Sequence, residues 1–289
     1  MVGAKLQRRF GNCLLVPVAV NNKHGMLLLD TGAPITVIDK NSVATYGLSV
    51  EKTNANVGGM LGTSWERYGI SKVKSIAMGN CTVTNVPVGI IDLSGSNENF
   101  MYIRLEHING VLGTHEMRKF GMIIDCTRQM LYLNPNGASA GLSQSLASFL
   151  TSKGFTRIPL HVTSGGHLEV EGSLNSNPTR FIVDTGSPTT TIDDRIALKS
   201  NISYNPMPHF RSGGVEGSSQ MMHSADVKEL AIGSFVIPKA EVEVLHLSSS
   251  VIGNESTAGF FGAEYLSFNF GVIDVGGQAL YLRHPDPRK

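Results

Sequence analysis

The sequence predicts an all-β protein made of two related lobes with few short helices, and three observations predict it. The chain has 289 residues, which suits two compact lobes better than one minimal domain. Short runs rich in Val, Ile, Leu and Thr are broken by Gly, Asn and Ser, the pattern of strands and turns. The chain also repeats itself once, so each copy is expected to form one lobe.

The internal repeat is long and ordered. Leu28–Gly32 reads Leu-Leu-Asp-Thr-Gly and Ile182–Gly186 reads Ile-Val-Asp-Thr-Gly, an offset of 154 residues (184 − 30). Two later blocks recur at an offset of 149 residues (262 − 113 and 282 − 133). They are an apolar-apolar-Gly element, Val111–Gly113 and Phe260–Gly262, and a Leu-Tyr-Leu run, Leu131–Leu133 and Leu280–Leu282. Two copies with so long a period indicate a duplicated domain rather than a solenoid.

Most of the expected elements are strands: Leu14–Val20, Met26–Asp30, Thr36–Ile38, Val86–Asp92, Met122–Asp125 and Met130–Leu133. The best helix signal is Ser143–Lys153, where Leu146, Phe149 and Leu150 have helical spacing. Arg157–Val162 reads as an extra strand without a counterpart in the first copy, placed to bridge the lobes. We therefore expect an N-terminal lobe at residues 1–137, an interlobe linker with this helix and strand at 138–165, and a C-terminal lobe at 166–289.

Composition excludes several function classes. The formal net charge is +1 with 16% charged residues, so no basic face for nucleic acid is expected. No apolar run approaches the ~20 residues of a transmembrane segment. The three cysteines have no close pair and are expected as free buried thiols. No metal or other cofactor is expected. The spacing of His107, His115, His209 and His223 does not match that of metal ligands.

The two Asp-Thr-Gly motifs point to acid–base chemistry. Each Asp ends a fully apolar strand, where a buried carboxylate is costly unless it is paired or used. A two-fold relation between the copies would bring Asp30 and Asp184 together. Two carboxylates a few ångströms apart share a proton, because both cannot ionise easily. One can then activate a water while the other donates a proton, so both are candidate catalytic residues.

With these motifs the chain resembles the pepsin and retropepsin superfamily of aspartic peptidases, and it is closer to the retropepsin-like branch. The resemblance covers nearly the whole chain and rests on the ordered pair of Asp-Thr-Gly and apolar-apolar-Gly elements, found twice. It implies a bilobal fold that holds a peptide or protein substrate as an extended strand between the lobes. It also implies that the dyad is supported by Thr31, Gly32, Thr185 and Gly186.

The resemblance leaves three functions open. The first is an active aspartic endopeptidase, the second a peptide- or polysaccharide-binding protein with an idle dyad, and the third a peptidase limited to self-processing. Because one chain carries both motifs, a monomer is expected. The family is often exported, and the low Lys and high Asn, Ser and Gly content favours a periplasmic or secreted location, with any signal peptide removed.

Two features depart from the family pattern. Pro34 and Pro188 occupy equivalent positions where the family often has a polar residue, and their side chains cannot hydrogen-bond to a carboxylate. This predicts a pH optimum that is not strongly acidic. In addition, both copies carry a glycine pair at the place of the substrate-covering flap, which fits two flaps or two ordinary hairpin turns. These flap and substrate-binding candidates are Gly58, Gly59 and Met60, with Gly213, Gly214 and Val215.

Overall fold

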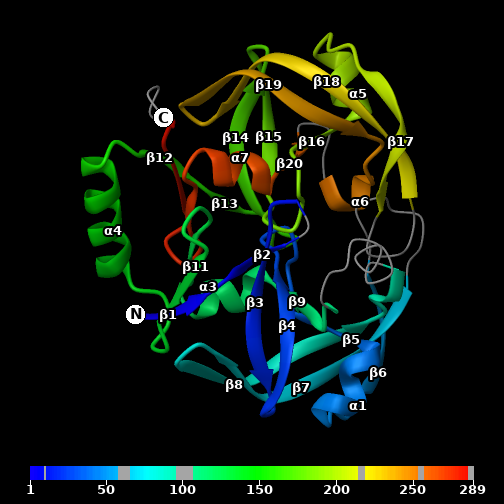
Figure 1. Cartoon of the computed structure of the whole chain (residues 1–289), viewed down its shortest axis with the longest axis vertical. Coiled ribbons are helices and arrows are strands. Elements are labelled where there is room, and N and C mark those ends of the chain that lie inside the picture. The colour runs from blue at the N-terminus through cyan, green and yellow to red at the C-terminus, as the bar shows by residue number, and fades with distance from the viewer. Residues whose placement is uncertain (10, 58–65, 96–106, 214–218, 253–256, 286–289) are drawn as a thin grey trace.

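The computed structural model describes residues 1–9, 11–57, 66–95, 107–213, 219–252 and 257–285 (Figure 1). Strands dominate, as the sequence predicts. The first copy contains β1 (Val2–Lys5), β2 (Gln7–Arg9), β3 (Cys13–Val20), β4 (Lys23–Leu29), β5 (Val37–Asp39), β6 (Glu51–Val57), β7 (Glu66–Met78), β8 (Cys81–Ile91), β9 (Gly110–Leu112), β10 (Ile123–Asp125) and β11 (Met130–Leu133).

The second copy repeats this series of strands in the same order. It contains β12 (Thr156–Pro159), β13 (His161–Val162), β14 (Leu168–Leu174), β15 (Asn177–Val183), β16 (Thr191–Asp193), β17 (Asn205–Gly213), β18 (Ser219–Ile232), β19 (Phe235–Leu245), β20 (Thr257–Phe261), β21 (Val272–Asp274) and β22 (Ala279–Leu282). The helices are short: η1 (Lys40–Ser42), α1 (Val43–Tyr46), α3 (Thr114–Lys119), α4 (Ala140–Ser152), α5 (Asp194–Lys199), α6 (Ser249–Ile252) and α7 (Ala263–Phe268).

Each copy folds into an eight-stranded sheet that closes on itself. The first has the order β2-β3-β4-β9-β5-β8-β7-β6, and the additional pairing of β3 with β7 closes the barrel. The second has the matching order β13-β14-β15-β20-β16-β19-β18-β17, closed by β14 and β18. The two barrels form the lower and upper halves of Figure 1. The expected all-β fold with two related lobes is therefore confirmed.

A third sheet joins the copies. Its order is β1-β11-β10-β21-β22-β12, and its central pair, β10 with β21, is antiparallel with Ile124 opposite Ile273. The strand expected at Arg157–Val162 was predicted to lack a counterpart, and this is wrong. β12 pairs with β22 at one end of the sheet as β1 pairs with β11 at the other. The strand therefore belongs to the duplicated pattern, and the lobe boundaries placed at 137 and 166 stay a prediction.

The main hydrophobic cluster contains residues of both barrels and of the six-stranded sheet, such as Leu29, Val183 and Ile124. Alternating side chains of the strands form this cluster, because every second side chain of a strand faces inward. The long strands β8 and β19 show this with nearly the same pattern of buried and exposed positions. The three cysteines are buried and free, as expected.

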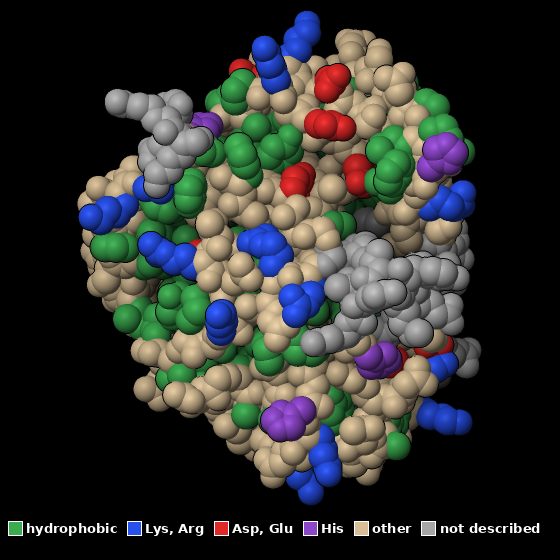
Figure 2. All heavy atoms as spheres, viewed as in Figure 1, with side chains coloured by type: hydrophobic (Ala, Val, Ile, Leu, Met, Phe, Trp, Pro, Cys, Tyr) green, Lys and Arg blue, Asp and Glu red, His purple; other side chains and the backbone are tan. Residues whose placement is uncertain are grey.

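Helix α4 begins three residues before the predicted Ser143 and lies on the outside of the molecule (Figure 1). Leu150 is buried, and Leu146 packs on the cluster under the helix, but Phe149 is 55% exposed. Within the described residues, no helix is long and apolar enough to cross a membrane. Figure 2 shows Lys and Arg side chains dispersed over both halves of the visible face.

Candidate active site

Asp30 and Asp184 each follow directly on a buried strand, β4 and β15. The apolar-apolar-Gly elements form β9 and β20, which run parallel to these strands. Their ends hold the two aspartates in place, because the Asp30 amide donates to Leu112 O (3.2 Å) and the Asp184 amide to Phe261 O (3.0 Å). The two repeated blocks that the sequence shows are thus neighbours in space.

Each aspartate is fixed by the turn that follows it. The Oδ1 atom of Asp30 accepts hydrogen bonds from the amides of Gly32 (2.8 Å) and Ala33 (3.0 Å). The Oδ1 atom of Asp184 accepts from Gly186 (2.7 Å) and Ser187 (3.1 Å) in the same way. One oxygen of each carboxyl group is therefore held by backbone donors, which orients both groups alike.

The two carboxyl groups adjoin where the copies meet, and each affects the pKa of the other. The glycine of each motif lies against the aspartate of the other. A Cβ added to Gly32 would lie 2.6 Å from Cγ of Asp184, and one added to Gly186 would lie 2.5 Å from Cγ of Asp30. A side chain at either position would push the carboxyl groups aside, so the motif requires glycine here.

Thr31 and Thr185 hydrogen-bond across the interface, as the resemblance implies. The Thr31 hydroxyl donates to Val183 O (2.6 Å) and accepts from the Thr185 amide (3.0 Å). The Thr185 hydroxyl donates to Leu29 O (2.6 Å) and accepts from the Thr31 amide (3.1 Å). Both side chains are buried, so this reciprocal set locks the two turns together away from water.

Both aspartates favour the protonated form more than an ordinary carboxyl group. Burial, and then the charge of Asp184, raise the pKa of Asp30 well above its usual range. Burial also raises the pKa of Asp184, although the hydrogen bond from Asp30 and those from Gly186 and Ser187 act in the opposite direction. The pair can therefore hold one proton between two carboxylates, the state that general acid–base catalysis needs.

A family model described as aspartyl protease matches this chain twice, at residues 16–115 and 170–265. The chain belongs to the aspartyl protease family. Each matched range contains one Asp-Thr-Gly motif, so each copy of the repeat matches the family model by itself. A retropepsin-like aspartic protease from Rickettsia conorii, known from a crystal structure, is 16% identical; the match covers 46% of this chain and 88% of that one, with a TM-score of 0.33. A search of curated proteins finds no match.

Behind the turns, this aspartyl protease family member has a threonine–glutamate pair in each lobe that the sequence analysis did not identify. The Thr36 hydroxyl bonds Glu116 and accepts from the Gly113 amide (3.1 Å). In the second lobe, Thr190 donates its amide to Glu264, and its hydroxyl accepts from the Gly262 amide (2.9 Å). The equivalence of the two threonines, at an offset of 154 (190 − 36), is the signal that could have found them.

The two prolines pack against the opposite lobe. Gly166 has a φ of +87°, and a Cβ added there would lie 3.2 Å from Cβ of Pro34. Gly11 has a φ of +60°, and a Cβ there would lie 2.9 Å from Cβ of Pro188. Proline therefore fills space between lobes at both positions. The expected effect on the pH optimum stays a prediction.

Two further residues contact the turns from across the interface. The thiol of Cys13 donates to Gly186 O (3.3 Å), and Nδ1 of His167 bonds Gly32 O (2.8 Å). Both were missed as site residues, although each lies 17 residues before its own aspartate (30 − 13 and 184 − 167). The two copies thus have different side chains, a thiol and an imidazole, at one equivalent position.

In the sequence, the flap candidates fall between β6 and β7 and at the end of β17 before β18, and the strands of each pair are antiparallel. Gly213 is the last residue of β17. The other candidates, Gly58, Gly59, Met60, Gly214 and Val215, lie outside the described residues. Whether the hairpins act as flaps or as ordinary turns stays open.

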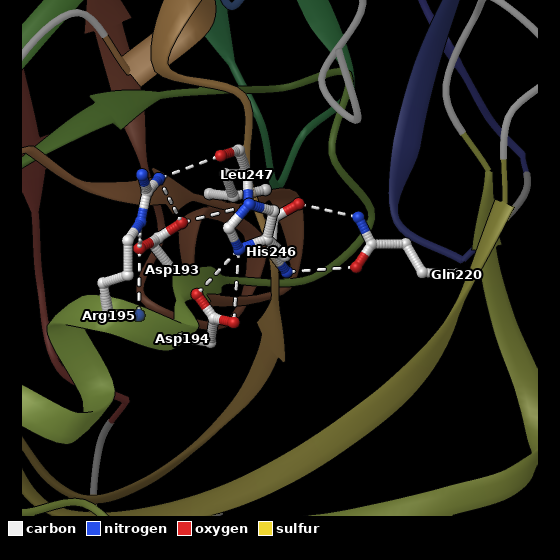
Figure 3. Close-up of polar contacts among 6 residues, drawn as sticks. All are labelled: Asp193, Asp194, Arg195, Gln220, His246 and Leu247. Carbon is white, nitrogen blue, oxygen red and sulfur yellow. Dashed lines mark hydrogen bonds and ion pairs between the residues drawn. The ribbon is translucent and has the colours of Figure 1, made fainter. Parts of the chain in front are cut away.

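One group of possible metal ligands occurs within the described residues: Asp193, Asp194 and His246 (Figure 3). Its geometry is that of ion pairs. Arg195 binds both carboxylate oxygens of Asp193, at 2.7 and 2.9 Å. Although Asp193 is buried, the hydrogen bonds and charge of Arg195 lower its pKa. Asp193 also caps α5, because its side chain accepts a hydrogen bond from the Arg195 amide.

Proposed function

We propose that this protein is an aspartic endopeptidase in which Asp30 and Asp184 act together on a bound water. One observation carries the proposal: two carboxyl groups from equivalent turns adjoin where the copies meet, each held by two backbone amides. Membership of the aspartyl protease family supports the same reaction class. The substrate is a peptide or protein chain in extended form.

The chemistry follows from the shared proton. The ionised carboxylate accepts a proton from the water as the water oxygen attacks the peptide carbonyl carbon. The protonated carboxyl group donates its proton to the carbonyl oxygen, which gives a neutral tetrahedral diol. Collapse of the diol breaks the C–N bond as the nitrogen takes up a proton. The aspartic protease dyad is the standard example of two carboxylates that share one proton in this way.

The test compares the parent protein with Asp30→Asn and Asp184→Asn on a mixed peptide library from acidic to neutral pH. Asparagine keeps an oxygen that can accept the two turn amides, but it cannot exchange the proton. Each change is expected to lower the cleavage rate by at least ~100-fold. Asp226→Asn is the matched control, because Asp226 is exposed on β18.

Cleavage that survives either dyad change would contradict the shared mechanism. Peptides that bind tightly to the parent protein without being cut would favour a binding function on the same scaffold. A statine-type transition-state analogue is expected to inhibit the enzyme, because it presents a tetrahedral hydroxyl at the position of the attacking water.

A further inference from the structure

The two aspartates are equivalent by duplication, but their surroundings are not. Cys13 and His167 occupy the same position in the two copies, 154 residues apart (167 − 13). Each reaches over the lobe interface to the carbonyl oxygen of the opposite Asp-Thr-Gly glycine, at 3.3 and 2.8 Å. Because a carbonyl oxygen only accepts, Nδ1 of His167 carries a hydrogen and donates it.

These contacts place the two side chains beside the dyad. Gly32, which His167 holds, presents its bare face to the carboxyl group of Asp184. Gly186, which Cys13 holds, presents its bare face to the carboxyl group of Asp30. Each side chain is thus one glycine away from the aspartate of its own lobe.

The two side chains differ in the charge they can carry. Imidazole gains a positive charge in the acidic range, whereas a thiol is neutral or negative. Burial, followed by the charges of Asp184 and Asp30, raises the pKa of the Cys13 thiol, so this group stays neutral. His167 can therefore bring a positive charge beside Asp184, whereas Cys13 cannot bring one beside Asp30.

We propose that His167 makes the dyad asymmetric, so that Asp184 carries the negative charge and Asp30 holds the proton. The inference rests on the proposed function and assigns its two roles. Asp184 becomes the base that takes a proton from the water, and Asp30 becomes the acid that donates to the peptide carbonyl. His167 is a positioning residue, which acts on the charge of Asp184 and does not itself exchange a proton with the substrate.

Burial raises both pKa values, but the other influences on the two carboxyl groups differ. The charge of His167 is among the effects that lower the pKa of Asp184, after the hydrogen bonds from Asp30 and the turn amides. Burial and the charge of Asp184 raise the pKa of Asp30 well above its usual range, although the hydrogen bonds from the two turn amides lower it.

Two other ionisable groups face this region, as their effects on Cys13 show. Arg8 on β2 is permanently charged, and its guanidinium binds Ser267 Oγ, Cys126 O and Asn12 O. Glu264 on α7 is buried, which raises its pKa to about 7, so it is neutral in the acidic range. Neither group is among the main influences on the pKa of Asp30 or Asp184, whereas His167 is among those on Asp184.

The test is a site-resolved titration of protein labelled with ¹³C at the aspartate carboxyl carbons. The two dyad signals are assigned by their loss in Asp30→Asn and Asp184→Asn. In the parent protein, the Asp184 signal is expected to show the ionised form at lower pH than the Asp30 signal. In His167→Asn, which keeps a side-chain donor for Gly32 O but has no charge, the Asp184 midpoint is expected to rise by about one pH unit.

Cys13→Ser is the matched control, because it keeps a donor to Gly186 O and should leave both midpoints unchanged. An Asp184 midpoint that does not move in His167→Asn, or a parent protein in which Asp30 ionises first, would overturn the inference. In the double exchange Cys13→His with His167→Cys, the order of the midpoints should be reversed, so that Asp30 ionises at lower pH than Asp184. The titration needs no substrate, so it separates this inference from the proposed function.

The pH dependence of cleavage gives a second readout. The acidic limb of kcat/KM reports protonation of the base in the free enzyme. For His167→Asn this limb is expected to move to higher pH by about one unit, as in the titration. At the plateau, kcat is expected to stay within about twofold of the parent value. A loss of kcat at every pH without a shift of the limb would indicate a purely structural role for His167 and contradict the proposal.

Discussion

Gly32 has no room for a side chain, because a Cβ there would meet the carboxyl group of Asp184. Gly32→Ala is expected to displace the proposed dyad and to lower peptide cleavage by about 100-fold, the usual effect of a misplacement near 1 Å. The measurement is kcat/KM, with circular dichroism as a check of folding. Gly141→Ala is the control: a Cβ there meets no atom within 4 Å, and alanine favours helix α4. An active Gly32→Ala enzyme would contradict the close approach.

Thr31 is expected to matter for stability through its buried hydroxyl. Thr31→Val keeps the shape but removes the donor to Val183 O and the acceptor for the Thr185 amide. The buried groups left without partners should lower the free energy of unfolding by about 1–3 kcal/mol, measured by urea denaturation. Thr31→Ser should retain most of the stability. Thr82→Val, on the exposed face of β8, should change the unfolding free energy by less than about 0.5 kcal/mol.

Single residues also show where sequence analysis reaches its limit. The repeat is sufficient to predict that Asp30 and Asp184 meet, because equivalent turns adjoin at a two-fold axis. Cys13 and His167 were missed because their partners lie in the opposite lobe and their residue types differ. The two glutamates were missed for another reason: Glu116 follows its glycine by three residues and Glu264 by two, so the offset does not align them.

Among the elements, the start of η1 and the start of α5 carry equivalent contacts between an acidic and a basic side chain, with the two sides exchanged. Lys40 pairs with Asp92 in the first lobe, whereas Asp194 pairs with His246 in the second (3.1 Å, Figure 3). The offsets are both 154 (194 − 40 and 246 − 92). The same contact is thus built twice with the acidic residue and its basic partner exchanged, which gives Asp194 and His246 a role that needs no metal ion.

The Lys40 pair predicts a pH-dependent stability. Hydrogen bonds from Lys40 and Ser94 lower the pKa of Asp92 to about 2 from 3.8. The lowered value means that the contribution is present above pH 3.8 and is lost as pH falls through about 2. Lys40→Met should therefore lower the unfolding free energy near pH 6, by less than about 1 kcal/mol because the pair is partly exposed, and have little effect near pH 2. Lys72→Met, an exposed change on β7, should show no such pH dependence.

Sequence reasoning placed β3, β5, β10 and β11 to within one residue at each end. Of the long hairpin strands in the first copy, it found only part of β8, expected at Val86–Asp92, and it did not list β7. It placed short edge strands poorly. β1 has four residues, Val-Gly-Ala-Lys, of which only Ala4 is buried, so it gives almost no periodic signal. Without β1, the segment at β12 has no visible counterpart, which is why it was read as an addition to the repeat. Helix α4 begins before the predicted start at Ser143, because its first turn is exposed and has no apolar pattern that marks it.

For the whole molecule, the arrangement predicts an enzyme that works as a monomer. The contacts that unite the two copies, the β10–β21 pairing and the Thr31–Thr185 bonds, lie within one chain. Their formation does not depend on protein concentration, unlike that of an obligate dimer. Specific activity should therefore stay constant over about a thousandfold dilution, and sedimentation should give one species of 31.0 kDa. A specific activity that falls on dilution, and recovers on concentration, would show that a second chain completes the site.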